Sequence, residues 1–529
     1  MCHLRLVSKN ALVSPETFRH VCTRRDYSPN GKGKFLTVRQ KIERQRQMGT
    51  LCKAGSEPMN QVNATDTTEQ RSSKRANTSH TGIDTSFLYQ DLRRMYLAHG
   101  EAIEVDFRNI VKWVRLGDQL SHQIHTYPAK LLPHIAHFFS RARSLAAPNS
   151  KVLDPFCGSG TVALEASLAG HRPLIADSNP FALLLSLVKT APYKIESLRI
   201  TCAELIGRAK RYRTAPEIDI VNAELWYTNK HKRALEIILR SIQEIEDEFS
   251  KNFFKICFSV TARRLSYADP AISVPVRLRA KPHFPLETNI RIDTRLLWIQ
   301  NVNAIDEFAR VAESNIQRID SANNSNPDRQ SAKIAGIDAR RLCKPGDPKQ
   351  RLATDSVALV ITSPPYGSAQ KYIRASSLSL NWLGLATPSD LARLEGQSIG
   401  REHLPRHLEV AQQVHPLSAR FTQVISKIEN LNPLRAQITR RYLEEMNSAI
   451  EEISRVVAKN GHAVFIVGNN QVCGEPLRSD EFMIESFANH GLNLELSLID
   501  HIKSRGLMTK RNKTASVISR EAILVFRKN

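Results

Sequence analysis

The 529-residue sequence is poor in cysteine and aromatic residues and has no long apolar run. Its eight cysteines include no Cys-x-x-Cys pair, which argues against a disulfide framework and a zinc ribbon. The longest apolar stretch, Phe181–Val188, is far shorter than the roughly 20 residues that span a bilayer. The N-terminus lacks the pattern of a secretory signal. These absences predict a soluble, cytoplasmic protein with no membrane association.

Charge is the strongest compositional feature. Lys and Arg number 75 against 52 for Asp and Glu, a formal net charge of +23 with a pI near 9.8. Such a balance favours a polyanionic partner, most often nucleic acid. The apolar share of 41% is sufficient for a sizeable core.

The first 85 residues differ from the rest. They hold 15 Lys/Arg and 7 Asp/Glu, so +8 of the charge (15 − 7) lies there, and residues 60–80 are dominated by small polar side chains. Burial of so few apolar groups does not offset the entropy of ordering. We therefore predict a disordered basic tail over residues 1–85 with a short helix at Val38–Met48. It is either a solvated leader, which we favour, or an arm on nucleic acid.

From Phe87 onward the pattern is globular. A helix is expected from Lys130 to Ala147, a strand at Lys151–Asp154, a helix at Thr161–Ala169 and a strand at Pro173–Asp177. Strand, glycine turn, helix and strand within about 30 residues make a βαβ unit, which requires a parallel sheet.

Residues 195–330 interrupt this alternation. Helices are expected at Ala234–Phe249 and Val302–Ile319, an irregular basic segment at Thr261–Pro285 and a polar linker at Ser321–Gln330. The region reads as an insertion.

Strand and helix signals return after residue 330. Strands are expected at Lys333–Ile337, Ser356–Ile361 and His462–Val467, a helix at Arg440–Ala458, and a closing strand pair at Leu492–Asp500 and Glu521–Phe526. The predicted fold is an α/β, doubly wound, mostly parallel sheet divided into segments 86–194 and 331–529 by the insertion.

The first motif is DPFCGSGT at residues 154–161. Gly158 and Gly160 allow a sharp turn and a close backbone approach to a ligand at the start of a helix. Asp177 follows Gly158 by nineteen residues (177 − 158), the usual place of an acid that binds ribose hydroxyls. Ala163 stands where a dinucleotide fingerprint has its third glycine, which weakens an oxidoreductase without excluding it. The sequence contains no Gly-Lys-Ser/Thr, so a P-loop is excluded.

The second motif is TSPPY at residues 362–366, directly after a predicted strand. Open α/β sheets bind ligands at this end of their strands. Consecutive prolines offer rigid carbonyl acceptors, Ser363 adds a hydroxyl and Tyr366 adds a flat ring. This set suits a planar base that bears an exocyclic amine.

Together the two motifs resemble the S-adenosylmethionine-dependent amino-methyltransferases of DNA. The resemblance covers residues 122–194 and 333–526 and implies a Rossmann-like methyltransferase fold, S-adenosylmethionine as methyl donor and no metal. It implies that Ser363, Pro364, Pro365 and Tyr366 form the catalytic loop. The residues that it assigns to the cofactor are Thr126, Tyr127, Asp154, Phe156, Gly158, Gly160, Asp177 and Asp338.

The order of the motifs resembles that of enzymes whose target-recognition region lies between them, here residues 195–330. Double-stranded DNA is therefore the expected partner, with a separately encoded restriction nuclease as a possible second one, and we expect a monomer or weak dimer. Arginine forks recognise guanine edges or phosphates. The residues expected to contact DNA are Arg263, Arg264, Tyr267, Arg277, Arg279 and Arg374.

The SPPY form resembles enzymes that make N4-methylcytosine, while adenine N6-methyltransferases more usually carry Asp or Asn at the position of Ser363. Three other interpretations remain open: adenine N6 methylation, tRNA guanosine N2 methylation, and a nucleic-acid binder without activity. Methylation of cytosine at carbon 5 needs a cysteine after a proline, which is absent. The histidine pairs His134/His137 and His403/His407 lack further metal ligands.

Overall fold

A computed structural model of the chain describes residues 83–111, 120–367, 371–404, 416–502 and 518–529. The predicted helix Val38–Met48 and the expected tail up to residue 82 lie outside these ranges. Residues 83–85, which we assigned to the tail, belong to the folded part. Thr85 is fully buried there, and its hydroxyl donates to the Phe138 carbonyl at 2.6 Å.

An eight-stranded sheet forms the centre of the fold, in the order β1-β9-β10-β6-β5-β2-β3-β4. All neighbours pair in parallel except β10, which is antiparallel to both β6 and β9. The predicted doubly wound, mostly parallel α/β fold is thereby confirmed. The strands are β1 (Ile103–Glu104), β2 (Lys151–Asp154), β3 (Arg172–Ala176), β4 (Lys333–Gly336), β5 (Val357–Thr362), β6 (Val457–Val467), β9 (Leu492–His501) and β10 (Arg520–Lys528).

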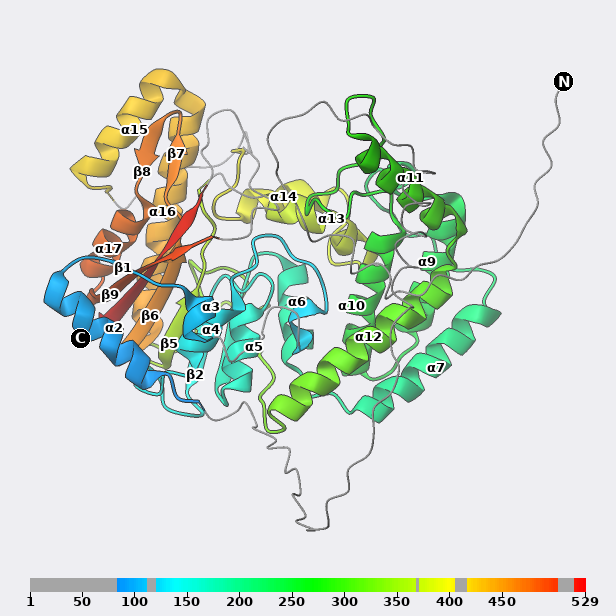
Figure 1. The fold of residues 1–529 in the computed structure, drawn as a ribbon, viewed down its shortest axis with the longest axis horizontal. Helices are drawn as coiled ribbons and strands as arrows, with labels where there is room; N and C mark the ends of the chain where they lie inside the picture. The colour runs from blue at the N-terminus through cyan, green and yellow to red at the C-terminus, as the bar shows by residue number, and fades with distance from the viewer. Residues whose placement is uncertain (1–82, 112–119, 368–370, 405–415, 503–517) are drawn as a thin grey trace, which may run out of the picture. The chain divides into compact units, whose positions relative to one another are not determined.

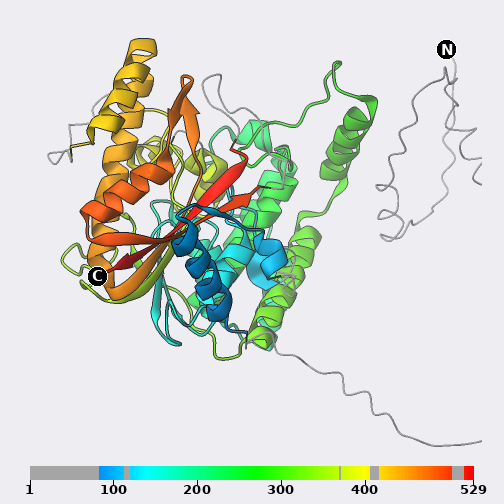
Figure 2. The same cartoon turned by 60° about the vertical axis from the view of Figure 1, so that its left-hand side comes forward.

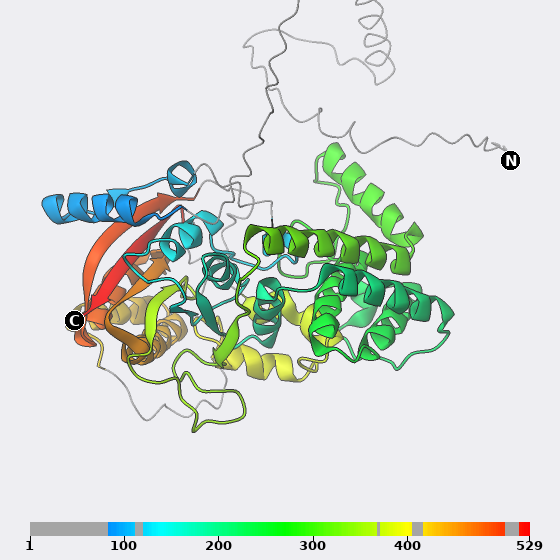
Figure 3. The same cartoon turned by 90° about the horizontal axis from the view of Figure 1, so that it is seen from below.

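Both faces of the sheet are covered, so its central strands β5 and β6 contain apolar runs without polar alternation. On β6, Val464 and Ile466 pack toward one face, while Phe465 packs toward the other. Helices α2 and α4 cover the first face, and α16 and α17 cover the second, as Figure 3 shows for α2 and α16 on opposite sides of the strands. A separate hairpin of β7 (Asn470–Val472) and β8 (Glu475–Leu477) lies beside α15 and α16 (Figure 2).

The helices divide into two groups. Those associated with the sheet and the β7–β8 hairpin are α2 (Ser86–His99), α3 (Phe107–Ile110), η2 (Leu120–Gln123), α4 (Pro133–Ser140), α5 (Thr161–Leu168), α6 (Pro180–Thr190), α15 (Ala419–Leu431), α16 (Pro433–Val456) and α17 (Ser479–Asn489). The others are α7 (Ile195–Arg211), α8 (Ala223–Trp226), α9 (Asn229–Gln243), α10 (Glu248–Leu265), α11 (Leu286–Asn301), α12 (Ala304–Ser325), α13 (Tyr372–Trp382) and α14 (Asp390–Gln397).

The predicted insertion is a helical unit, with α7 and α9–α12 gathered on one side of the sheet (Figure 1). Its core is continuous with α6 on one hand and with α13 and α14 on the other. Phe181, Phe254, Phe308 and Trp382 all belong to this single apolar cluster.

Several predicted helices differ from the observed ones in their bounds. The expected helix Ala234–Phe249 is interrupted, because the Asp247 side chain accepts from the N–H groups of Phe249 and Ser250 and so starts a new helix, α10. The expected helix Lys130–Ala147 is shorter: it begins at Pro133 and ends at Ser140, where the Ala142 N–H turns back to the Phe139 carbonyl. Helix α12 also runs six residues beyond the predicted Ile319, through the first half of the expected linker.

Candidate active site

The strand order reverses its direction between β2 and β5, and ligands of open α/β sheets bind at such a point. The two strands end at Asp154 and Thr362, and the Thr362 hydroxyl donates to Asp154 Oδ1 at 2.7 Å. The two predicted motifs, which are 208 residues apart at this contact, therefore start side by side.

Asp154 is buried and connects the two loops through its hydrogen bond with Thr362. It is 4% exposed, and burial raises the pKa of its carboxyl to about 7, against the opposing hydrogen bonds from Thr362 and the Phe156 N–H. It does not line the cleft described below, so its predicted contact with the cofactor would be indirect.

A cleft opens above these strand ends. Its empty volume is about 660 Å³, counting the open mouth. Seven residues predicted for the cofactor or for catalysis line it: Tyr127, Phe156, Gly158, Asp177, Asp338, Ser363 and Pro365. Thr126, Gly160, Pro364 and Tyr366 do not.

The glycine turn has the backbone that its sequence predicts. Gly158 and Gly160 have φ of 42° and 72°, a region that favours glycine. A Cβ on Gly158 would lie 3.2 Å from the Tyr127 ring, and one on Gly160 would lie 2.9 Å from Ser186 Cα. Gly158 thus shapes the cleft itself, while Gly160 allows the close approach of α5 and α6.

Asp177 faces the cleft from the end of β3. Its carboxylate accepts from the Gly158 N–H at 2.9 Å and from the Asn179 N–H at 2.8 Å. Burial raises the pKa of this carboxyl to about 6, while the two backbone donors oppose the shift. The group is therefore ionised at neutral pH and offers its remaining lone pairs to hydroxyl donors.

Asn179 connects the parts of the site and was missed by the sequence analysis. It is 1% exposed, and its Nδ2 donates to the Tyr127 hydroxyl and to Ser376 Oγ on α13, both at 3.1 Å. Its Oδ1 caps α6 by accepting from the Phe181 N–H. The sequence did contain a signal, because an Asn directly before Pro180 is typical of a helix start.

Neighbouring elements hold the TSPPY loop in place. The Tyr442 hydroxyl donates to the Pro365 carbonyl at 3.0 Å, and Asn470 Nδ2 donates to the Gly367 carbonyl at 3.1 Å. The Tyr366 hydroxyl donates to Glu521 Oε1 at 2.7 Å. Ser363 and Pro365 are thereby presented to the cleft by a loop with fixed carbonyls.

Asp338 lines the cleft after β4 and is half-buried. Its carboxylate is paired with Arg340 at 2.8 Å, and Arg340 also contacts Glu445 at 3.0 Å. The pairing leaves carboxylate lone pairs for a further donor. The adjoining wall, which the sequence did not predict, consists of Gln397, Ser398 and Ile399.

The arginines predicted to contact DNA fall into two classes. Arg263 donates to the carbonyls of Asp269 and Ile272, and Arg264 pairs with Glu307 at 2.9 Å, so both have partners within the protein. Such pairing weakens them as DNA contacts, which stay a prediction.

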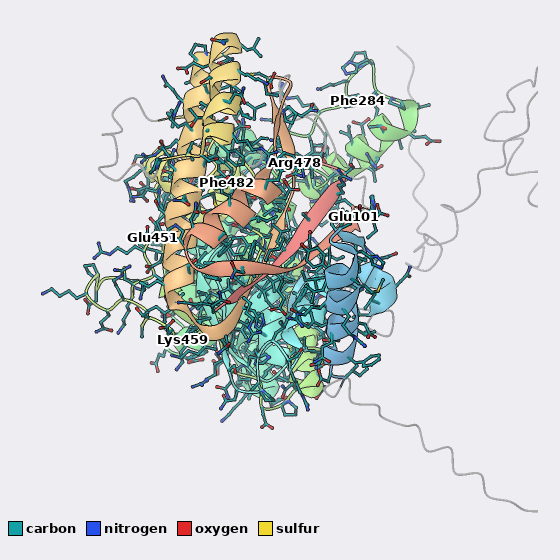
Figure 4. The ribbon with its side chains drawn as sticks, turned by 90° about the vertical axis from the view of Figure 1, so that its left-hand side faces the viewer. Glu101, Phe284, Glu451, Lys459, Arg478 and Phe482 are labelled. Carbon is teal, nitrogen blue, oxygen red and sulfur yellow. The ribbon has the colours of Figure 1, made fainter. Side chains whose placement is uncertain are left out.

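The second class consists of Arg277, Arg279 and Arg374. Arg277 lies over the Tyr267 ring at 5.2 Å, and Arg279 and Arg374 are exposed. Arg277 and Arg279 belong to the segment that leads to Phe284 and α11, which Figure 4 shows well away from Glu451 on α16. None of these three lines the cleft.

Within the described ranges, no group of three or more His, Cys, Asp or Glu side chains is arranged to hold a metal ion. No helix in the same ranges is long and apolar enough to cross a membrane.

Comparisons with known proteins agree with this site. Residues 123–213 match the family described as RMKL-like, methyltransferase domain. The Type II methyltransferase M.MvaI of Kocuria varians is 23% identical over 422 residues, covering 75% of this chain and 88% of that enzyme. The Type II methyltransferase M.MjaII of Methanocaldococcus jannaschii is 28% identical over 91 residues, 17% of each chain.

Among solved structures, the chain matches a protein assigned as a DNA modification methylase from Thermus thermophilus, in complex with S-adenosyl-L-methionine. The identity is 17%, with 33% of this chain and 49% of that chain covered and a TM-score of 0.16, too low to support a functional conclusion. The sequence matches confirm the predicted relationship to the DNA methyltransferase family. They do not distinguish methylation at cytosine N4 from methylation at adenine N6.

Proposed function

We propose that this methyltransferase transfers a methyl group from S-adenosylmethionine to the exocyclic 4-amino group of cytosine in DNA. The observation that carries the proposal is the cleft that brings the glycine turn and Asp177 together with Ser363 of the SPPY loop. A site for a ribose-bearing cofactor and a site for an amine thus share one cavity.

The residues present fit the cofactor. Asp177 is an ionised acceptor suited to ribose hydroxyls, and Asp338 is a second acceptor suited to the amine of an adenine. The absence of a Cβ on Gly158 lets the Tyr127 ring lie close to the turn, because an added Cβ would be 3.2 Å from that ring. When bound, S-adenosylmethionine supplies an electrophilic methyl group on a sulfonium.

The SPPY loop has the task of activating a poor nucleophile, since the lone pair of a base amine is conjugated into its ring. Ser363 Oγ, which lines the cleft, accepts an amine hydrogen and localises that lone pair on the nitrogen, while Pro364 and Tyr366, which lie outside the cleft lining, support the loop. Orientation by a rigid loop supplies most of the rate in this scheme. The target base must first leave the helix stack.

Two observations support DNA as the substrate. The match to M.MvaI extends over 75% of the chain, well beyond the methyltransferase domain match at residues 123–213. The net charge of +23 suits a polyanion. In this proposal the helical unit of α7–α12 reads the target, with the exposed Arg279 and the ring-stacked Arg277 as its first candidates for contact.

The decisive experiment is transfer from labelled S-adenosylmethionine to mixed-sequence duplex DNA, followed by nucleoside analysis. N4-methylcytosine is the expected product. N6-methyladenine would retain the mechanism and change the base, and label in tRNA alone would move the activity to RNA. Ser363→Ala is expected to bind S-adenosylmethionine normally and to lose methyl transfer by about 100-fold or more. Equal turnover by this variant would remove the proposed role of the loop.

A further inference from the structure

Helix α11 projects from the helical unit. Within Leu286–Asn301, Ile292 and Ile299 are the side chains that the helix buries against the rest of the protein. Figure 3 shows α11 standing out from α12, and Figure 4 shows Phe284, just before the helix, far from the sheet. We call residues 277–301, which comprise α11 and the segment that leads to it, the α11 arm.

The arm carries a second apolar face, which is open to solvent. Leu286, Ile290 and Leu297 are 75%, 55% and 59% exposed. At roughly 3.6 residues per turn, the fourth and eleventh residues after Leu286 lie on the same side of the helix as Leu286 itself. Ile292 and Ile299 lie on the opposite side. Three large aliphatic side chains in one exposed stripe forgo the stabilisation of burial, which indicates a surface that another molecule covers.

The charge of the arm indicates what kind of molecule that is. Residues 277–301 hold five Lys/Arg and two Asp/Glu, a net charge of +3 (5 − 2). Arg279, Lys281 and Arg291 are exposed, and none of them forms an ion pair with an acid in the ranges that the structure describes. Two copies of the arm would repel each other, whereas the phosphates of a nucleic acid would be attracted.

Hydrogen bonds fix the turn before α11. The Lys281 N–H donates to Asn289 Oδ1 at 3.0 Å, and Asn289 Nδ2 donates back to the Lys281 carbonyl at 2.9 Å. The Phe284 N–H donates to the same carbonyl at 3.0 Å, and the Lys281 ammonium lies 5.2 Å from the centre of the Phe284 ring. Lys281 is thus held in place relative to the apolar stripe, which lowers the entropy cost of binding a ligand with both.

We propose that α11 lies in the major groove of the DNA duplex on which the cleft acts. This groove, about 12 Å wide, admits an α-helix, and thymine presents its methyl group there. The stripe of Leu286, Ile290 and Leu297 contacts thymine methyl groups, while the exposed cations of the arm contact phosphates at the edges of the groove. Figure 1 shows α11 at the end of the molecule where α13 and α14 border the cleft, so a duplex over the cleft lies on the side of the arm. The inference rests on the proposed function, which supplies DNA as the substrate.

The apolar contact is tested by replacing thymine with uracil, which pairs in the same way but lacks the methyl group. Fluorescence anisotropy measures binding of the protein to a mixed-sequence duplex made with either base. We expect the wild type to bind the uracil duplex more weakly, by about 4-fold for each methyl group that the stripe contacts. Leu286→Ser and Ile290→Ser should weaken binding to the thymine duplex and reduce the preference for thymine.

The ionic contacts are tested by salt, with matched controls on α7. Lys281→Gln should reduce the slope of log affinity against log salt concentration by about 1, whereas Leu286→Ser should leave this slope unchanged. On α7, Lys210 is exposed and Ile200 is 55% exposed. Lys210→Gln and Ile200→Ser should therefore bind both duplexes as the wild type does. Because all these substitutions change exposed side chains, affinity for S-adenosylmethionine should stay at the wild-type value.

Three results would overturn the proposal, and they are distinguishable. Equal binding of the thymine and uracil duplexes by the wild type, with methyl transfer to DNA intact, would remove the groove contact and leave the proposed function standing. A wild type that sediments as a dimer without DNA, and that Leu286→Ser makes monomeric, would assign the stripe to a second copy of the chain. A wild type that neither binds nor methylates DNA would overturn the proposed function, and the placement of α11 with it.

Discussion

Replacing Gly160 by alanine tests how the glycine turn supports the cleft. Gly160 precedes α5 with φ of 72°, and an added Cβ would lie 2.7 Å from Ser186 Oγ and 2.9 Å from Ser186 Cα on α6. The Ser186 hydroxyl can rotate away, but its Cα moves only with α6. The substitution therefore forces the turn and α6 apart.

The expected cost has two parts. A left-handed backbone costs a non-glycine residue roughly 1–2 kcal/mol, and overpacking against a backbone atom costs roughly 1–3 kcal/mol. The free energy of unfolding should thus fall by about 2–5 kcal/mol. Gly170→Ala is the matched control, because Gly170 has φ of 82° with no atom within 4 Å of its added Cβ. It should lose only the first part.

Urea denaturation of the wild type and both variants measures the two costs, and calorimetric titration with S-adenosylmethionine measures the effect on the cleft. Gly160→Ala is expected to be the less stable variant and to bind the cofactor more weakly, because the turn also carries Gly158. Gly170→Ala should bind as the wild type does. Equal stability of the two variants would refute the argument that contact with α6 determines the glycine at residue 160.

Two further predictions concern charged groups. Affinity for S-adenosylmethionine should fall as pH drops below about 6, because the pKa of Asp177 is raised to about 6 and protonation of its carboxylate removes an acceptor. Binding titrations between pH 5 and 8 measure this dependence. An affinity that does not change with pH would contradict the role of Asp177. Arg401→Met should lower the free energy of unfolding by about 3 kcal/mol, the lower end of the cost of breaking a buried ion pair. Arg401 contacts the Glu445 carboxylate at 2.9 and 3.0 Å. The cost stays at the lower end because Arg340 and Arg441 still pair with Glu445 in the variant. Urea denaturation checks this, and an unchanged midpoint would show that the pair contributes little.

The parts of the site that could be predicted from sequence are those set by local chain geometry. A glycine at residue 158 and an acid at residue 177 are readable because a turn after a strand and the end of the next strand of a βαβ unit lie at one edge of the sheet. The closing strand pair was predicted correctly because Leu492–Asp500 alternates apolar with polar residues and Glu521–Phe526 is mostly apolar, and β9 and β10 do pair.

The parts that could not be predicted depend on contacts between distant segments. Glu521 reads as an ordinary first residue of a strand, and Tyr442 as one apolar position of a long helix. Only the sheet order brings them to the SPPY loop. The groups that Arg263 and Arg264 contact could not be predicted either, because the sequence shows that a residue is charged but not which group it pairs with.

The helical unit and the cleft are best regarded as one body. Helix α6 is capped by Asn179, which contacts Tyr127 and Ser376, and both α6 and α13 contribute side chains to the core of the unit. Trp382 of α13 donates to the Tyr227 hydroxyl at 3.0 Å within that core. Because close-packed interiors transmit displacement, a movement of the unit on DNA would reach the walls of the cleft through these two helices. Under the proposed function, recognition of the target and binding of the cofactor would therefore depend on the same packing.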